Sequence, residues 1–309
     1  MAGSPRVTVG MPLFNAERYL TESLDALLAQ DYRDFELIIS DNASTDRTWE
    51  ICRRYAARDR RIRLHRNPAN LGGHVNYARV VQLARGELFK WAAYDDICRP
   101  SLLSACVSAL DATGPETVLA YPQTALIDEA GRLIGPYEDG LDLRDPRPWR
   151  RVAAVADRIN LCHAHFGVFR LAALRRTGLI RPYLSSDYTL VAEVARLGAI
   201  HEVPERLFLR RLHRASTRQA AGATGSTASG VAWYAPDEPA QPVRSPHRRM
   251  VVETLRTLAT GDAPRGTRIS CAAAFLASWE VRRARVRLGA WRRRHWRRPP
   301  TAALPSGAA

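Results

Sequence analysis

Lysine is nearly absent from this chain of 309 residues, because Lys90 is the single lysine among 46 basic residues. Such arginine usage beside abundant alanine is typical of GC-rich coding and indicates no particular function. Cysteine is scarce too: the five cysteines form an odd set without a C-x-x-C pair, and no secretory signal opens the chain. These absences argue against a disulfide framework and predict a reduced, cytoplasmic setting.

Long apolar runs are missing as well. The longest, 269–279, falls short of the roughly 20 residues that a helix needs to cross a bilayer. We therefore expect no membrane span. Hydrophobic residues still make up 46% of the chain, enough to bury a sizeable core in one or two domains.

Acidic residues are absent from the C-terminal stretch 281–309, which holds nine arginines and so nine of the fifteen net positive charges. The rest of the chain carries a modest charge, which weakens a chain-wide role in binding nucleic acid. Trp291 and Trp296 alternate with these arginines. Peripheral contact with an anionic membrane surface and a solvated basic end are both open, and nucleic acid is a weaker third alternative.

The first hundred residues alternate strand and helix patterns with short connections. The expected strands are 6–11, 35–40, 61–65 and 87–93, and the expected helices are 16–30, 44–57 and 74–84, with Asn15 as the first N-cap and Ser44 or Thr45 as the second. Repeated β-α units with nearly continuous apolar strands predict an α/β fold, a mostly parallel central sheet flanked by helices.

Beyond Pro100 the pattern loosens. We expect a helix at 101–112, strands near 117–127, a loop at 135–148, partly helical segments at 155–178 and 186–198, and a strand at 200–213. The composition of 215–247, rich in Ala, Gly, Ser, Thr and Pro, predicts a flexible linker. The predicted organisation is a domain at 1–214 (halves 6–110 and 111–214), that linker, and a basic helical extension at 248–309.

Polar residues follow the ends of the expected strands. Asp41 follows the second strand, Asn70 the third, and Asp95 with Asp96 the fourth, so these side chains should meet at the sheet edge where α/β proteins bind ligands. Two adjacent carboxylates can simply end a strand in solvent. Alternatively, a divalent cation relieves their repulsion, and Mg²⁺ or Mn²⁺ prefers few carboxylates together with the phosphates of a substrate.

The stretches "VTVGMPLFNAERYLTESLDALLAQDYRDFELIISDNASTDRTWEI" and "RNPANLGGHVNYARVVQLARGELFKWAAYDD" resemble the family 2 glycosyltransferases. The resemblance is strong over about 6–110 and weaker as far as "RRLH" near 213. It implies the Rossmann-like GT-A fold and inverting transfer of a sugar from a nucleoside-diphosphate sugar to an acceptor hydroxyl, with Mn²⁺ or Mg²⁺ as cofactor.

The resemblance also implies roles for individual residues at the nucleotide. Those that would contact the donor nucleotide or its sugar are Pro12, Phe14, Asn15, Asp41, Asn70, Gly72 and Asp95. Asp41 would accept a hydrogen bond from the base ring, and Gly72 would allow a turn with positive φ. Asp46 fits a helix-capping role better.

The metal motif departs from the family pattern D-x-D-D, because Ala93 replaces its first aspartate. The resemblance then implies Asp96 as the direct metal ligand, with His213 of "RRLH" completing the shell. Arg210 or Arg211 is the alternative in that motif, as a clamp on the diphosphate.

Asp187 is the expected catalytic base, with Ser186 at the position where relatives often carry glutamate. The alternative role of Asp187 is to cap the helix that follows it, and the two roles are compatible. His163 and His165 lie in a segment that faces the acceptor in relatives, although ordinary packing also explains them.

The predicted partners are the sugar donor and a glycan, lipid-linked or small-molecule acceptor, in cell-surface glycan or polysaccharide assembly; no nucleic acid is expected. The predicted location is the cytoplasm, and a place at the inner face of the membrane is left open. A catalytically inactive GT-A scaffold is the alternative, since it would explain Ala93 and Ser186.

Overall fold

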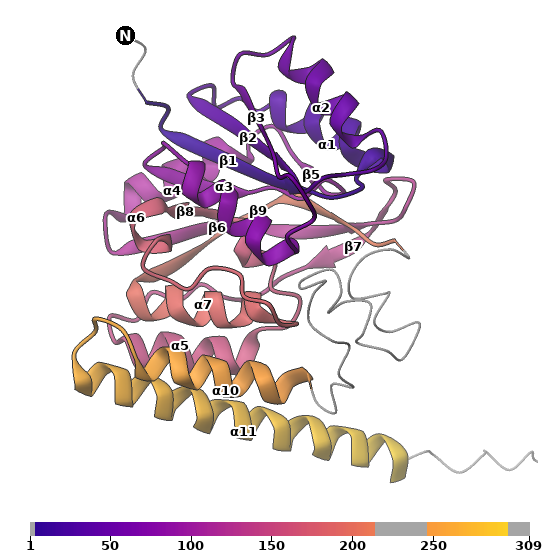
Figure 1. Cartoon of the computed structure of the whole chain (residues 1–309). Helices are drawn as coiled ribbons and strands as arrows, with labels where there is room; N and C mark the ends of the chain where they lie inside the picture. The colour runs from indigo at the N-terminus through magenta and orange to yellow at the C-terminus, as the bar shows by residue number, and fades with distance from the viewer. Residues whose placement is uncertain (1–3, 214–245, 296–309) are drawn as a thin grey trace, which may run out of the picture.

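The computed structural model describes residues 4–213 and 246–295, with side chains described as far as 288. Its centre is a sheet of nine strands in the order β3-β2-β1-β4-β8-β6-β9-β5, with β7 paired to β6 (Figure 1). The strands are β1 (Val7–Leu13), β2 (Phe35–Asp41), β3 (Ile62–Arg66), β4 (Leu88–Trp91), β5 (Ile97–Cys98), β6 (Thr117–Ile127), β7 (Leu133–Tyr137), β8 (Val168–Arg170) and β9 (Ala199–Arg211).

Helices connect most of these strands. They are α1 (Glu17–Leu28), α2 (Thr48–Ala56), α3 (Gly73–Leu83), α4 (Leu102–Thr113), α5 (Pro148–Arg158), the short 3-10 turn η1 (His163–Phe166), α6 (Leu171–Leu174), α7 (Ser186–Leu197), α10 (Pro246–Ala259) and α11 (Arg265–His295). The expected β-α order of the first hundred residues is therefore confirmed.

Parallel pairing brings the carboxyl ends of several strands to one edge. Strands β1 to β4 are mutually parallel, and Leu13, Asp41 and Arg66 lie in register at the ends of β1, β2 and β3. Strand β6 is parallel to β9, and both run in the same direction as β4 because β8 is antiparallel to its two neighbours. The polar residues after these strands therefore share one rim, as the sequence predicted.

The apolar interior depends on one close approach of helix to strand. A side chain at Gly10 of β1 would lie 2.8 Å from Val80 of α3 and 2.7 Å from the ring of Phe89, so only glycine lets α3 lie this close to the sheet. Trp91 packs edge-on against Phe89 and Phe169, with ring centroids 5.0 and 5.6 Å away.

Two strands lie where the sequence predicted other structure. Strand β8 lies inside the expected helical stretch 155–178 and separates β4 from β6; its three residues are too few to show a period of two. Strand β7 begins before the expected loop at 135–148 and pairs only with β6, so Leu133 and Ile134 are exposed at its start.

A stack of helices lies beneath the sheet in Figure 1: α7 nearest, then α5 and α10, and α11 along the bottom. Met250 and Leu258 of α10, with Phe275 and Trp279 of α11, are buried in the same apolar cluster as the sheet residues. The predicted linker falls almost entirely on residues 214–245, outside the described residues. Among the described helices, none is both long and apolar enough to cross a bilayer.

Candidate active site

Asp96 is buried just beyond β4, where two groups of β9 hold its carboxylate. Arg210 Nη1 donates to Oδ2 at 2.7 Å, and the backbone N–H of Arg211 donates to Oδ1 at 2.9 Å. Burial raises the pKa of Asp96 to about 6, with the charge of Asp95 adding to this and Arg210 opposing it. In the structure this carboxylate is therefore part of the interior, and it does not end a strand in solvent.

Asp95 is hydrogen-bonded to His213, which lies just after the end of β9. His213 Nε2 lies 2.8 Å from Asp95 Oδ2, although 118 residues separate the two in the chain. Burial by itself raises the pKa of Asp95, but the hydrogen bond from His213 and the charge of Arg210 together hold it below the ordinary value. Asp95 is thus ionised at neutral pH.

The pair Asp95 and His213 has the spacing of two ligands on one divalent cation. Neighbouring ligands of an octahedral Mg²⁺ or Mn²⁺ at about 2.1 Å lie about 3.0 Å apart, close to the observed 2.8 Å. The other ring nitrogen of His213 is buried without a hydrogen-bond partner among the described residues. The residues present therefore fit a metal. The sequence predicted Asp96 as its direct ligand, but both oxygens of Asp96 already accept hydrogen bonds, and the carboxylate nearest to His213 is Asp95.

Arg211 fixes the acidic loop, the segment between β4 and β5 that carries Asp95 and Asp96. Its side chain is 2% exposed, and its Nε donates to the Asp95 carbonyl oxygen at 2.9 Å. Nη1 donates to the carbonyl oxygens of Asp128 and Glu129, and Nη2 to Glu22 at 2.6 Å. Because all of these donors are used within the protein, Arg211 positions the loop. The side chain of Arg210 is 22% exposed, so Arg210 is the arginine closer to solvent.

A shallow depression lies beside the acidic loop, at the carboxyl ends of β1 and β2. Its lining residues are Pro12, Leu13, Phe14, Asn42, Asn70, Gly73, Asn76 and Tyr77. Three of the predicted nucleotide contacts, Pro12, Phe14 and Asn70, line it together. Asn42 and Tyr77 were missed, although Asn42 follows Asp41 directly and Tyr77 lies one helical turn after the glycine pair.

Asparagine side chains make a hydrogen-bonded network around this depression. Asn76 donates to the carbonyl oxygens of Leu13 and Ser40, and Asn67 donates to Asn42 Oδ1 at 2.9 Å. Asn42 in turn donates to Asn70 Oδ1 at 2.7 Å. This last oxygen also accepts the N–H of Gly72, whose φ of 85° confirms the predicted turn.

Asp41 and Asn15 hold the β2–α2 loop in the structure. The buried Asp41 carboxylate accepts from Ser44 N and pairs with Arg66 Nε at 3.0 Å, while Asn15 Oδ1 accepts from Thr45 N at 2.9 Å. Their contact with a nucleotide stays a prediction.

The helix caps differ from the expected ones. The N-caps are Ala16 for α1 and Arg47 for α2, neither with a side-chain cap bond. Asp46 provides hydrogen-bond acceptors to the N-termini of both helices, because its two carboxylate oxygens accept from the backbone N–H groups of Glu17 and Thr48. The capping role proposed for Asp46 thus describes its place in the structure.

Asp187 lies in the first turn of α7 and is partly exposed. Burial raises the pKa of this carboxyl to about 6, against hydrogen bonds from backbone N–H groups and from the Cys162 thiol. A carboxylate with a pKa near neutrality is well matched to removing a proton from a hydroxyl. Ser186 beside it has a buried hydroxyl without a partner among the described residues.

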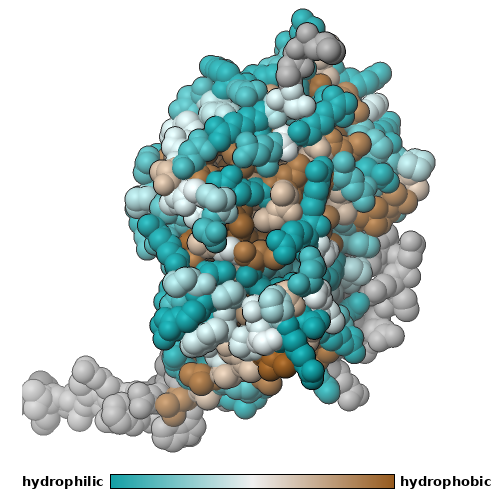
Figure 2. All heavy atoms as spheres, turned by 90° about the vertical axis from the view of Figure 1, so that its left-hand side faces the viewer, coloured by the Kyte–Doolittle hydropathy of each residue, from teal (hydrophilic) through white to brown (hydrophobic). Residues whose placement is uncertain are grey.

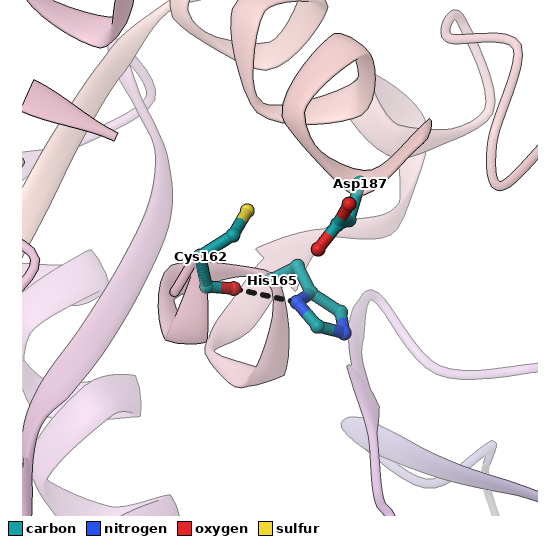
Figure 3. A group of neighbouring side chains, drawn as sticks. All are labelled: Cys162, His165 and Asp187. Atoms are coloured by element: carbon teal, nitrogen blue, oxygen red, sulfur yellow. Dashed lines mark hydrogen bonds between the residues drawn. The ribbon is translucent and has the colours of Figure 1, made fainter. Parts of the chain in front are cut away.

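Figure 3 shows Cys162, His165 and Asp187 gathered at one place, with ligand atoms within 4.8 Å of one another. His165 Nδ1 donates to the Cys162 carbonyl oxygen at 2.6 Å, so this nitrogen carries the proton. Burial lowers the pKa of His165 to about 4 and raises that of the thiol, so both groups are neutral near pH 7. These residue types can bind a metal, but the hydrogen bond that His165 makes within the group is to the Cys162 carbonyl oxygen and leaves Asp187 out.

The comparisons with known proteins decide the family. Residues 8–179, more than half of the chain, match the model of glycosyl transferase family 2. The chain belongs to glycosyl transferase family 2. An uncharacterized glycosyltransferase of Haemophilus influenzae is 29% identical over 219 residues, which are 69% of this chain and 67% of that one.

Solved structures agree in fold. The chain resembles S. aureus TarS 1–349 in complex with UDP-GlcNAc, with a TM-score of 0.64 and 15% identity over 88% of this chain and 72% of that one. It also resembles the mannosyltransferase PcManGT of Pyrobaculum calidifontis in complex with GDP-Man and Mn²⁺, with a TM-score of 0.52 and 18% identity over 93% and 80% of the chains. The expected GT-A fold and glycosyltransferase class are thereby confirmed.

Proposed function

We propose that this family 2 glycosyltransferase transfers a sugar from a nucleoside-diphosphate sugar to an acceptor hydroxyl with inversion, in cell-surface glycan or polysaccharide assembly. The observation that carries the proposal is the pairing of Asp95 with His213 on the rim that also holds the asparagine-lined depression. The named neighbours were solved with UDP-GlcNAc and with GDP-Man and Mn²⁺, which supports this class of donor.

In this mechanism the nucleoside lies in the depression and the diphosphate points toward the acidic loop. Asp95 and His213 would hold Mn²⁺ or Mg²⁺, and the metal would offset the charge on the departing diphosphate. Asp96 keeps Arg210 beside the phosphates as a second source of positive charge. Arg211 fixes the loop that carries both carboxylates.

Asp187 acts on the acceptor. As the ionised base it removes the proton of the acceptor hydroxyl while that oxygen attacks the anomeric carbon, and the C–O bond to the diphosphate breaks. The neighbouring thiol of Cys162 lowers the pKa of this carboxyl and so favours its ionised form. The acceptor is a glycan end, a lipid-linked sugar or a small molecule, and the basic C-terminal stretch favours one at the inner face of the membrane.

A donor-hydrolysis screen tests the proposal without knowledge of the acceptor. Purified protein is incubated with UDP-, GDP- and dTDP-sugars and Mn²⁺, and the released nucleoside diphosphate is measured. We expect slow release from one nucleotide class, lost with chelator and in Asp187→Asn. If no donor is turned over by folded protein, the inactive-scaffold alternative replaces the enzyme.

A further inference from the structure

Helix α11 carries a second apolar face that is exposed to solvent in the described part of the chain. Ala277, Val281, Ala284 and Leu288 are all exposed, Val281 by 57% and Leu288 by 50%. Their spacing of four, three and four residues places them in one stripe along the helix. In the sequence the same spacing continues to Trp291.

This stripe differs from the face that holds α11 on the protein. Cys271, Phe275 and Trp279 are buried toward α5 and α10, and at 100° per residue they lie on another side of the helix. Ala277 and Val281 border an open groove between α11 and α5. Figure 2 shows apolar surface exposed at the lower end of the molecule, where α11 lies.

Arginines flank the stripe on both sides. At 100° per residue, Arg283 and Arg287 fall on one side and Arg285 on the other. Arg283 pairs with Glu280, and Arg285 with Asp157. Arg287 makes no ion pair with the described residues. No acidic residue follows Glu280 in the chain, whereas nine arginines do.

An apolar stripe between two arginine rows suits an anionic lipid surface. Two copies of α11 packed on each other would bring arginine rows together, which opposes self-association through this face. A bilayer accepts the apolar side chains at the headgroup boundary and offers anionic headgroups to the arginines. We propose that α11 from Ala277 onward docks on the surface of an anionic phospholipid membrane.

The placement of α11 gives this contact a consequence for the enzyme. Arg282 Nη1 donates to the Ala156 carbonyl oxygen, and Arg285 pairs with Asp157, so this part of α11 lies along the end of α5. The chain after α5 leads directly to His163–Phe166, the turn beside Asp187. In Figure 1 the C-terminal end of α11 points to the same side of the molecule as the C-terminal end of β9. Since a helix docked in this way lies in the plane of the bilayer, docking would keep the neighbouring end of α5 close to the membrane surface, a consequence that rests on the proposed function.

Vesicle sedimentation of the full-length protein tests the contact with no sugar donor present, so its outcome is independent of the transferase proposal. We expect binding to vesicles of phosphatidylcholine mixed with phosphatidylglycerol, weakened by salt, and none to phosphatidylcholine alone. One basic residue near an anionic surface contributes about 1 kcal/mol, or about fivefold in binding. The double variant R283A/R287A should therefore bind roughly 25-fold more weakly. R53A/R54A, which removes two exposed arginines of α2, should bind like wild type.

The stripe itself is tested by Leu288→Ser, with Ile269→Ser as the matched control on the same helix, since Ile269 is 58% exposed but outside the stripe. We expect several-fold weaker binding for Leu288→Ser alone, with unchanged circular dichroism. Equal losses in R283A/R287A and R53A/R54A would reduce the effect to net charge and overturn the proposal. So would failure of wild type to bind the anionic vesicles, or preferential binding to duplex DNA in competition.

Discussion

Replacing Asp187 by asparagine should remove the base and leave the donor site intact. The exchange keeps the size of the side chain but takes away the proton acceptor, and general-base catalysis contributes about 10² to 10⁴ in rate. We expect nucleotide release at saturating donor to fall by at least about 100-fold, while nucleotide affinity stays within about twofold, because Asp187 lies on α7 and the depression is lined by residues 12–77.

The pH dependence of the wild-type rate sharpens this prediction. The active form of Asp187 is ionised, and its pKa is raised to about 6. Activity should be nearly full at pH 8, half-maximal near 6 and about one-tenth at pH 5. Cys162→Ala removes a hydrogen bond that lowers this pKa. In that variant the pH at which activity is half-maximal should therefore be higher than in wild type.

The assay is nucleotide release against pH at saturating donor, for wild type, Asp187→Asn and Cys162→Ala. Saturation matters because Asp96 also has a pKa of about 6, and its protonation should affect donor binding first. If Asp187→Asn keeps more than about a tenth of the wild-type rate, or if Cys162→Ala leaves the pH of half-maximal activity unchanged, Asp187 is not the base.

Three further predictions concern the supports of the site. Arg211→Met removes hydrogen bonds to three carbonyl oxygens, the buried one of Asp95 and the partly buried ones of Asp128 and Glu129. At about 1 kcal/mol each, urea unfolding should show a loss of up to about 3 kcal/mol, and a loss below about 1 kcal/mol would contradict the positioning role. Gly72→Ala forces alanine to a φ of 85°; it should cost about 1–3 kcal/mol in unfolding free energy and weaken nucleotide binding, with Gly135→Ala, on an open exposed strand, as the unaffected control. Lys90 is the single lysine and fully buried, with Nζ donating to the carbonyl oxygens of Trp91 and Phe166; an amine-reactive label should modify only the N-terminus of the native protein and one further site after denaturation, and native labelling of Lys90 would show that this contact opens.

Much of the donor half could be predicted because its signals are local. Each strand of the first hundred residues is a short apolar run, each helix has its own periodicity, and parallel pairing then places Asp95, Asp96 and Asn70 at one rim. Strand β8 could not be predicted, since three residues between two helical turns gain their extended form only from pairing with β4 and β6.

The partner of His213 could not be read from the sequence for a geometric reason. Strand β9 changes register against β6 near Pro122 and Gln123, and each single-residue shift exchanges the faces of a strand. The sequence can indicate that Arg210, Arg211 and His213 return to the acidic loop. Which of them meets Asp95, and which meets Asp96, depends on a bulge that only the folded sheet reveals.

The most direct test of the donor site is a calorimetric titration of UDP, GDP and dTDP with Mn²⁺ into wild type, Asp95→Asn and His213→Ala, each repeated with chelator. The account predicts that one nucleotide binds wild type only with the metal, and that each variant loses at least about tenfold in affinity, as removal of a metal ligand or its partner commonly does. Metal-dependent binding that is equal in all three proteins would contradict the assignment of Asp95 and His213 to the cation.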